Sequence, residues 1–203
     1  MNEHPFKIKN MARVTDTSRI ENLEDAAISL VVEKGYSSSS VSDIARKAGI
    51  SAGYLYSHYK SKEDLVLSIY ERNINIFDDY IDYIIASSST VSEFAKQFIS
   101  YMFNRANELP DLVKFLLLLV FDRTFNIPAM RLNKTREQCR QILKKGIDNG
   151  EIADGYSPED VYIVYFSIPF KLLENRLEKA TAYRAFTDAD VNRVSDMCIK
   201  ALQ

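Results

Sequence analysis

The chain has 203 residues, a net charge of −2 and a hydrophobic content of 46%, which is enough for a packed core and excludes a disordered protein. Its first residues lack an apolar signal segment and its longest apolar run, at 115–121, is too short to span a bilayer, so we expect a cytoplasmic protein. Since the whole chain is not a polycation, any contact with phosphate groups has to come from a local basic patch.

The pattern of apolar residues predicts an all-α protein. There are only 6 Gly and 5 Pro, β-type alternation is scarce, and long stretches repeat apolar residues with helical periodicity. We predict about nine helices in three parts: a flexible N-terminal arm at 1–15, a three-helix domain at 16–63, and a second helical domain at 64–203. The first helix is expected from about Asp16 to Lys34.

Residues 40–63 predict two short helices joined by a tight turn. Ser40 is followed three residues later by Asp43, the spacing with which a serine and an acid cap the start of a helix. Gly49 suits the left-handed conformation that follows many helix ends.

Ser51 is the next candidate cap, and the second short helix should run from there to about Tyr59. Leu55 and Tyr59 share one face of this helix and are expected to anchor it to a core. The other face holds small, polar and aromatic side chains. Two capped helices in this arrangement are typical of a helix-turn-helix, which presents its second helix to the major groove of DNA.

The residues from 19 to 65 resemble the N-terminal DNA-binding domain of the TetR family of transcriptional regulators. The resemblance covers about a quarter of the chain. The residues that carry it are Ala26, Ala27, Leu30, Glu33, Lys34, Gly35, Tyr36, Val41, Asp43, Ile44, Ala45, Ala48, Gly49, Ile50, Ser51, Gly53, Leu55, Tyr56, His58, Tyr59, Lys62, Glu63 and Leu65.

The resemblance implies that Tyr56, His58 and Lys62 contact phosphates, and their side chains can all donate hydrogen bonds to phosphate oxygens. Where the family often has a threonine or another small residue, this chain has Tyr54, which puts the identity of its operator in doubt. The remaining candidate DNA-contacting residues are Ser40 and Ser51 at the helix starts, and Ala52, Gly53, Tyr54 and Ser57 for base readout. The candidate cations for a local basic patch are Lys7, Lys9, Arg13, Arg46, Lys47, Lys60 and Lys62.

The rest of the chain predicts one long helix and five further ones. The long helix should run from about 62 to 85, out of the first domain and into the second, because neither Gly nor Pro interrupts it. The others are expected at 91–107, 110–122, 128–148, 158–180 and 188–202, with Asp188 as a candidate cap of the last. Pro169 should kink or split the helix at 158–180.

Large apolar and aromatic side chains in the second domain are candidates for a small-molecule pocket, although for each of them a place in the core is an alternative. The resemblance also implies a ligand-binding C-terminal domain. The candidate ligand residues are Phe98, Tyr101, Met102, Phe115, Leu116, Leu119, Tyr162, Tyr165 and Phe166.

The last two predicted helices carry more apolar surface than one core-facing stripe needs, which indicates a four-helix dimer interface; packing within one chain is the alternative. The resemblance implies a dimer as well. The candidate interface residues are Tyr162, Leu172, Leu173, Leu177, Val191, Val194, Met197 and Cys198.

These features together predict a repressor that binds a palindromic DNA operator as a homodimer and leaves it when a small, largely apolar or aromatic effector binds. We expect no cofactor, no metal and no membrane partner. An enzyme is not expected, because no phosphate loop, metal cluster or nucleophile elbow is present. The alternative is a helical interaction module in which the helix-turn-helix is only structural.

Overall fold

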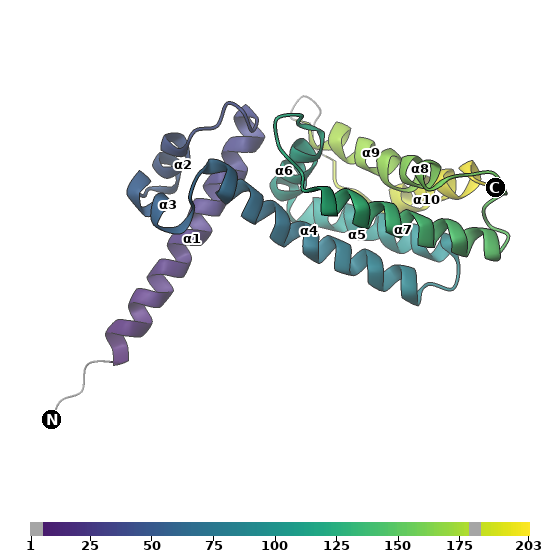
Figure 1. Cartoon of the computed structure of the whole chain (residues 1–203), viewed down its shortest axis with the longest axis horizontal. Helices are drawn as coiled ribbons and strands as arrows, with labels where there is room; N and C mark the ends of the chain where they lie inside the picture. The colour runs from purple at the N-terminus through teal and green to yellow at the C-terminus, as the bar shows by residue number, and fades with distance from the viewer. Residues whose placement is uncertain (1–5, 179–183) are drawn as a thin grey trace. The chain divides into compact units, whose positions relative to one another are not determined.

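The computed structural model describes residues 6–178 and 184–203, and of residues 6–15 the backbone alone. Its described residues form helices joined by loops, with no strand among them, which confirms the all-α class (Figure 1). The helices are α1 (Phe6–Lys34), α2 (Val41–Ala48), α3 (Ala52–His58), α4 (Lys62–Ser87), α5 (Val91–Glu108), α6 (Pro110–Phe121), α7 (Ala129–Asp148), α8 (Pro158–Val161), the π-helical segment η1 (Tyr162–Ser167), α9 (Ile168–Leu177) and α10 (Asp188–Ala201).

The chain divides into two compact units, residues 1–73 and 74–203, with the division inside α4. The first unit contains α1, α2, α3 and the start of α4. In this unit α1 begins at Phe6, earlier than the expected start at Asp16, because neither Gly nor Pro interrupts the segment as far as Lys34. Residues 6–15, which we expected within an arm, are therefore helical, and residues 1–5 lie outside the described part of the chain.

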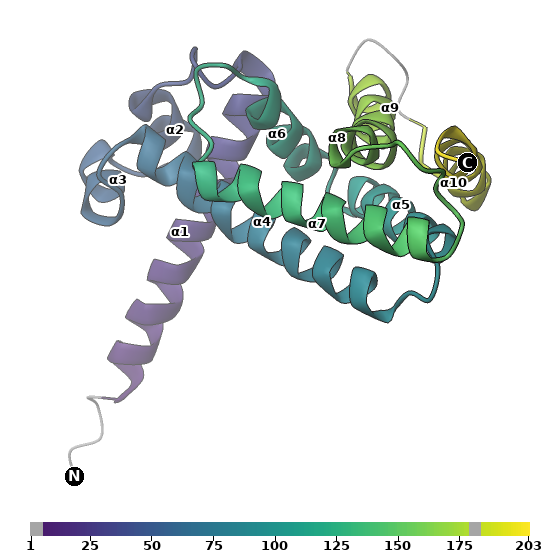
Figure 2. The same cartoon turned by 45° about the vertical axis from the view of Figure 1, so that its right-hand side comes forward.

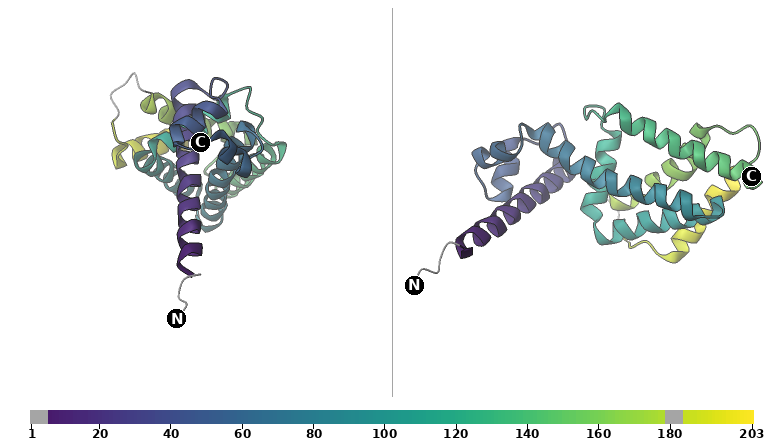
Figure 3. Two further views of the ribbon diagram at one scale, coloured as in Figure 1. Left: turned by 90° about the vertical axis from the view of Figure 1, so that its left-hand side faces the viewer. Right: turned by 60° about the horizontal axis from the view of Figure 1, so that its bottom comes forward.

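The four helices of the first unit lie together (Figure 3), and one apolar core joins them. The side chains of this core are at most 5% exposed. Burial of this apolar surface is the main force that holds the short helices α2 and α3 in place. The core residues are Leu23, Ala27, Leu30 and Val31 of α1, Ile44 and Ala45 of α2, Leu55 of α3, and Leu65, Val66 and Ile69 of α4.

A buried acid also ties α1, α3 and α4 together. Glu24 of α1, 8% exposed, accepts a hydrogen bond of 3.0 Å from the hydroxyl of Tyr59 at the end of α3. The same carboxylate pairs with the guanidinium of Arg72 in α4. Burial and the neighbouring Glu24 raise the pKa of Tyr59 to about 12, so its hydroxyl remains a donor at neutral pH.

The second unit is built around an aromatic core. Within it, α4, α5 and α7 run side by side, and α10 packs against α5 (Figure 2). Phe94 and Phe98 of α5 stack at 5.6 Å, and Phe98 also contacts Phe166 of η1 at 4.9 Å between ring centroids. A buried ion pair adds to this core, because Asp78 of α4 accepts a hydrogen bond of 2.6 Å from Arg131 of α7.

Pro169 splits the helix at 158–180 as predicted, and the split takes the form of a π-helix. The amide of Ile168 bonds to the carbonyl of Ile163, five residues back, which widens the helix before the proline. Pro169 has no amide proton, so the carbonyl of Val164 has no donor five residues ahead. The thiol of Cys198 in α10 donates to that carbonyl instead, at 3.1 Å.

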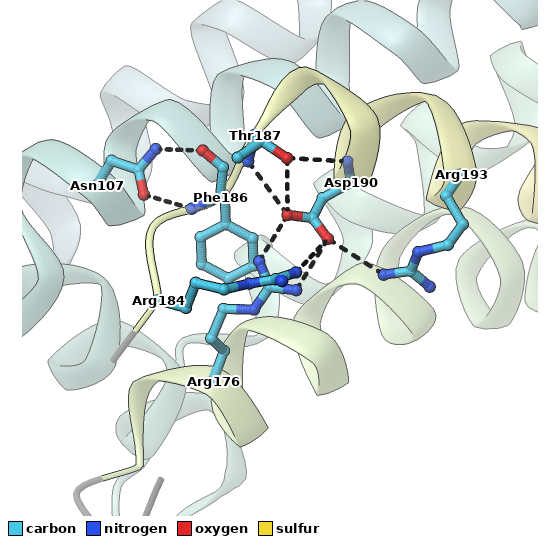
Figure 4. Close-up of polar contacts among 7 residues, drawn as sticks. All are labelled: Asn107, Arg176, Arg184, Phe186, Thr187, Asp190 and Arg193. Carbon is cyan, nitrogen blue, oxygen red and sulfur yellow. Dashed lines mark hydrogen bonds and ion pairs between the residues drawn. The ribbon is translucent and has the colours of Figure 1, made fainter. Parts of the chain in front are cut away.

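The start of α10 is fixed by one acid that holds two helices together (Figure 4). The N-cap is Thr187, not the expected Asp188, because Thr187 and Asp190 have the spacing that forms a capping box. Asp190 also accepts two hydrogen bonds, of 2.8 and 2.9 Å, from Arg176 of α9. This pairing holds the pKa of Asp190 well below its usual range.

The loop before α10 is held by α5 as well. The side-chain amide of Asn107 exchanges two hydrogen bonds with the backbone of Phe186, and Arg176 lies over the Phe186 ring at 4.2 Å. Among the residues that the structure describes, none of the helices is long and apolar enough to cross a membrane.

Candidate nucleic-acid interface

The predicted helix-turn-helix is formed by α2, a three-residue connection and α3. Ser40 caps α2 by accepting a hydrogen bond of 3.1 Å from the amide of Asp43, and Ser51 caps α3 in the same way from Tyr54, also at 3.1 Å. Gly49 closes α2 in the left-handed conformation, with φ 68°, as the sequence predicts. The two short helices are thus set at their starts and at the turn by local interactions.

Leu55 is completely buried and fixes which face of α3 points outward. On the outward side, Gly53, Tyr56, Ser57 and His58 are exposed. A Cβ atom added at Gly53 would meet no atom closer than 3.8 Å, so packing within the chain does not require glycine there. The open space above Gly53 is what close approach of a nucleic-acid backbone or base needs.

Tyr54 does not extend freely from α3. Its hydroxyl donates a hydrogen bond of 2.5 Å to the carboxylate of Asp16 in α1. Its ring lies 4.7 Å from that of His58, and His58 Nε2 is 3.8 Å from the same Asp16 oxygen. The guanidinium of Arg19 lies 5.8 Å from the centre of the Tyr54 ring. Tyr54 and His58 therefore form one cluster with two residues of α1.

Three other predicted contact residues also use their polar atoms within the chain. The Ser40 hydroxyl donates to Asp43 at 2.9 Å, and the Ser57 hydroxyl donates to the carbonyl of Tyr54 at 2.7 Å. The ammonium of Lys62 donates to the carbonyl of Tyr36 at 2.8 Å and lies 4.3 Å from the centre of its ring. Lys62 keeps further N–H donors for a phosphate, because an ammonium carries three.

The basic patch around the motif is largely balanced by acids. Lys47 pairs with Glu33 at 2.6 Å, and Arg46 pairs with Asp43. Residues 1–73 contain equal numbers of basic and acidic side chains. The side chains of Lys7, Lys9 and Arg13 lie outside the described part of the chain. Attraction to phosphates thus depends on where the cations lie, not on an excess of them.

The candidate ligand residues are mostly core residues in this structure. Phe98, Met102, Phe115, Leu119, Tyr165 and Phe166 are buried, and Leu116, Tyr101 and Tyr162 are partly buried. Among their aromatic rings, Phe98 and Tyr162 both pack on Phe166, at 4.9 and 5.7 Å between centroids. Tyr101 lines an open groove of about 570 Å³ in the second unit.

That groove follows the outer face of α5, and most of the residues that line it have a polar group. Tyr80 of α4 stacks on Tyr101 at 4.0 Å, and Val191 of α10 closes one side. Sequence reasoning missed the polar members, although they recur at helical spacing along α5. They are Lys96, Gln97, Ser100, Asn104, Arg105 and Glu108.

The candidate interface residues fall into two groups. Leu173, Leu177, Val194 and Cys198 are buried within the chain. The remaining four keep apolar surface in contact with solvent: Met197 is 50% exposed, and Tyr162, Leu172 and Val191 are partly buried.

The two cysteines have the chemistry of core residues. Both are buried, and burial raises the pKa of Cys139 to about 12 and that of Cys198 to about 11, so both stay protonated at neutral pH. Within the described residues, no group of three or more His, Cys, Asp or Glu side chains is arranged to hold a metal ion.

Comparison with known proteins shows which class of protein has this helix-turn-helix and this fold. Residues 23–69 match the family described as bacterial regulatory proteins, tetR family. Over 147 residues the chain is 29% identical to the fatty acid metabolism regulator protein of Bacillus subtilis (strain 168), a match that covers 64% of this chain and 69% of that protein. Matches to the next curated relatives span only about a third of their length.

Solved structures share the fold over nearly the whole chain. FadR from Bacillus subtilis in complex with stearoyl-CoA has a TM-score of 0.72 at 24% identity, with 90% of this chain and 99% of that chain covered. The complex of SmeT, the repressor of a Stenotrophomonas maltophilia multidrug efflux pump, with triclosan has a TM-score of 0.69 at 18% identity, with 92% of each chain covered.

A helix-turn-helix with an exposed second helix, joined to a larger helical unit, defines a DNA-binding transcriptional regulator. The match over residues 23–69 assigns the DNA-binding domain of this chain to the TetR family of such regulators. These matches confirm the family predicted from the sequence. They also confirm the expectation that the protein is a regulator and not an enzyme. They do not favour the alternative in which the helix-turn-helix is only structural.

Proposed function

We propose that the chain is a repressor that binds a palindromic operator as a homodimer and is released from it by a small, largely apolar or aromatic molecule. The observation that carries this proposal is the outward face of α3, with its open space above Gly53 and its exposed Tyr56 and His58. A two-fold dimer would place two such helices in successive major grooves, about 34–36 Å apart.

The proposed dimer forms through α9 and α10. Leu172, Val191 and Met197 supply apolar surface that is still open to solvent, and Ile163 in η1 adds a side chain that is 49% exposed. The buried members of the predicted set pack α9 and α10 against the core of the second unit; they are Leu173, Leu177, Val194 and Cys198. Association of two copies would bury this surface, which is the usual reason for an exposed apolar face on a helix pair.

The proposed effector enters the second unit near Tyr101, where the groove along α5 meets the aromatic core through contacts of Tyr101 with Phe77 at 6.3 Å and of Phe77 with Phe98 at 5.8 Å. The names of two relatives suggest the chemistry to try first, an acyl-CoA thioester and a chlorinated aromatic compound. Since α4 supplies residues to both units, it is the proposed route by which binding alters the first one.

Release requires that the effector bind the two states of the protein with different affinity. A difference of about 1–3 kcal/mol would change DNA affinity by roughly 5- to 150-fold. A ligand without that preference would leave DNA affinity unchanged, however tightly it binds.

The test is fluorescence anisotropy with full-length protein on a duplex selected from a randomised library. We expect wild type to bind the selected duplex specifically and to be released from it by stearoyl-CoA or by triclosan. Tyr54→Ala should bind that duplex more weakly while remaining a dimer, as measured by sedimentation. If Tyr54→Ala binds the selected duplex as wild type does, Tyr54 is not a readout residue. If no sequence is enriched from the library, operator binding itself is wrong.

A further inference from the structure

The contact between Asp16 and Tyr54 has a chemical consequence for base readout. A tyrosine hydroxyl has one proton to donate and two lone pairs that accept. In this structure the proton points to Asp16 Oδ1, at 2.5 Å, and the hydroxyl also lies 3.3 Å from the Asp16 backbone carbonyl. Partial burial and the hydrogen bond to Asp16 raise the pKa of Tyr54, so the hydroxyl keeps its proton at neutral pH. Only its lone pairs remain for another partner.

We propose that Asp16 is a specificity-determining residue that makes Tyr54 a hydrogen-bond acceptor toward the bases of the operator. In the major groove, adenine and cytosine each present an amino group that donates, whereas guanine N7 and O6 and thymine O4 only accept. An acceptor at Tyr54 therefore favours adenine or cytosine at the base it contacts. This inference rests on the proposed binding of α3 to operator DNA.

The surroundings of Tyr54 are suited to hold it in one orientation. The ring contacts His58, at 4.7 Å, and the guanidinium of Arg19, at 5.8 Å. A hydroxyl fixed at one end and a ring with two such contacts lose little further freedom when DNA binds. Asp16 and Arg19 are three residues apart on α1, so they lie on the same side of that helix.

The charge of Asp16 has a separate effect. Its side chain is 52% exposed, and it lies beside two side chains that we place at the DNA surface. A carboxylate there repels phosphates, which every duplex carries, and so weakens binding to every sequence by a similar factor. The hydrogen bond to Tyr54 and the charge of Asp16 can be tested separately with Asp16→Asn, because asparagine keeps an acceptor oxygen and carries no charge.

The experiment compares base enrichment from a randomised duplex library for six full-length proteins: wild type, Asp16→Ala, Asp16→Asn, Tyr54→Phe, the double variant with Asp16→Ala and Tyr54→Phe, and Glu21→Ala. Glu21 is an exposed acid on the same helix, and its variant is the control for loss of charge. Wild type should enrich adenine or cytosine at one position of each half-site by about two- to ten-fold, the worth of one hydrogen bond. Asp16→Ala should lose this preference at that position alone.

The other variants decide the mechanism. Asp16→Asn should keep the preference and bind random duplex more tightly than wild type. Tyr54→Phe should lose the preference, and adding Asp16→Ala to it should change base selection no further, as expected when one residue acts through the other. Glu21→Ala should select the same sequence as wild type.

Several outcomes would overturn the inference. If Asp16→Ala or Tyr54→Phe selects the same bases as wild type, or if wild type prefers guanine or thymine at the position that Tyr54→Phe affects, Tyr54 is not an acceptor set by Asp16. If wild type selects no sequence at all, the proposed operator binding fails and the inference falls with it. Thermal unfolding of each variant shows whether a change in selection comes from loss of the fold.

Discussion

At the scale of single residues, Gly53 is a position where the stability of the fold does not require glycine but close approach to DNA does. Nothing in the free protein occupies the space above it, and it is a poor helix former within the short helix α3. The free protein would therefore tolerate a larger residue at this position. We therefore expect that glycine is needed here when α3 is bound to DNA.

We predict that Gly53→Ala leaves the free energy of unfolding unchanged or raises it by up to about 1 kcal/mol. The same variant should bind the selected duplex at least about ten-fold more weakly, because the added methyl group prevents close approach. Chemical unfolding and an anisotropy titration, made on one preparation, check both parts. Unchanged DNA affinity would show that α3 does not approach DNA at Gly53.

Tyr59 gives a prediction about pH. Its pKa of about 12 in the folded protein lies above the ordinary value of 10.0. The hydrogen bond to Glu24 therefore stabilises the fold fully below pH 10, and its contribution is lost as pH rises from about 10 toward 12, because the unfolded chain gives up the proton first. Tyr59→Phe should lower the free energy of unfolding at pH 8 and lose less stability than wild type between pH 8 and 11.

Urea unfolding of both proteins across that pH range checks the difference, which cancels the contributions of the other tyrosines. A gap between wild type and Tyr59→Phe that stays constant from pH 8 to 11 would contradict the proposed bond to Glu24.

The residues of the interface differ in how well the sequence predicts them. The caps at Ser40 and Ser51 and the turn at Gly49 follow from local spacing and are present as expected. The bond between Tyr54 and Asp16 joins residues 38 apart in sequence. No periodicity signals such a contact, because it depends on how α1 packs against the helix-turn-helix.

At the scale of elements, the π-helical segment η1 shows how one residue changes a helix. Pro169 was expected to kink or split the helix, but the identity of the atom that would satisfy the freed carbonyl was not predictable. Cys198 lies 34 residues from Val164, and the thiol reaches the carbonyl only because α10 packs beside η1. A residue that reads as an ordinary core cysteine thus has a second role as a donor.

We predict that Cys198→Ala destabilises the protein by about 1–3 kcal/mol, since it leaves a buried carbonyl without a donor. In a Pro169→Ala background the same substitution should cost less, because residue 169 then supplies an amide proton to this part of η1. A double-mutant cycle by chemical unfolding measures the coupling. Additive effects of the two substitutions would refute the link between Pro169 and Cys198.

The elements as a whole were predicted well, and their ends less so. Long periodic stretches gave the helices of the second unit close to their observed positions. The start of α1 was placed too late because no cap or breaker marks it, and the cap of α10 is Thr187 because its hydroxyl and Asp190 act together. The division between the units falls within α4, where the sequence has no break to show it.

At the scale of the whole molecule, the charge balance predicts that one copy of the motif binds DNA weakly. Basic and acidic side chains are equal in number in residues 1–73, and residues 74–203 carry the net negative charge. Nonspecific attraction to phosphates is therefore small, and affinity has to come from two recognition helices acting together.

The aromatic core of the second unit shows why a pocket was not predictable from the sequence: the same residue types fill a core and line a ligand site.

The most direct test of the central claim is the affinity of full-length protein for its selected duplex and for the same duplex with about half a helical turn (~5 base pairs) inserted between the half-sites. A dimer with two fixed recognition helices should lose at least about a hundred-fold in affinity and fall to the level of a duplex with one half-site. Equal affinity for the original and the lengthened duplex would contradict an operator read by two α3 helices at a fixed spacing.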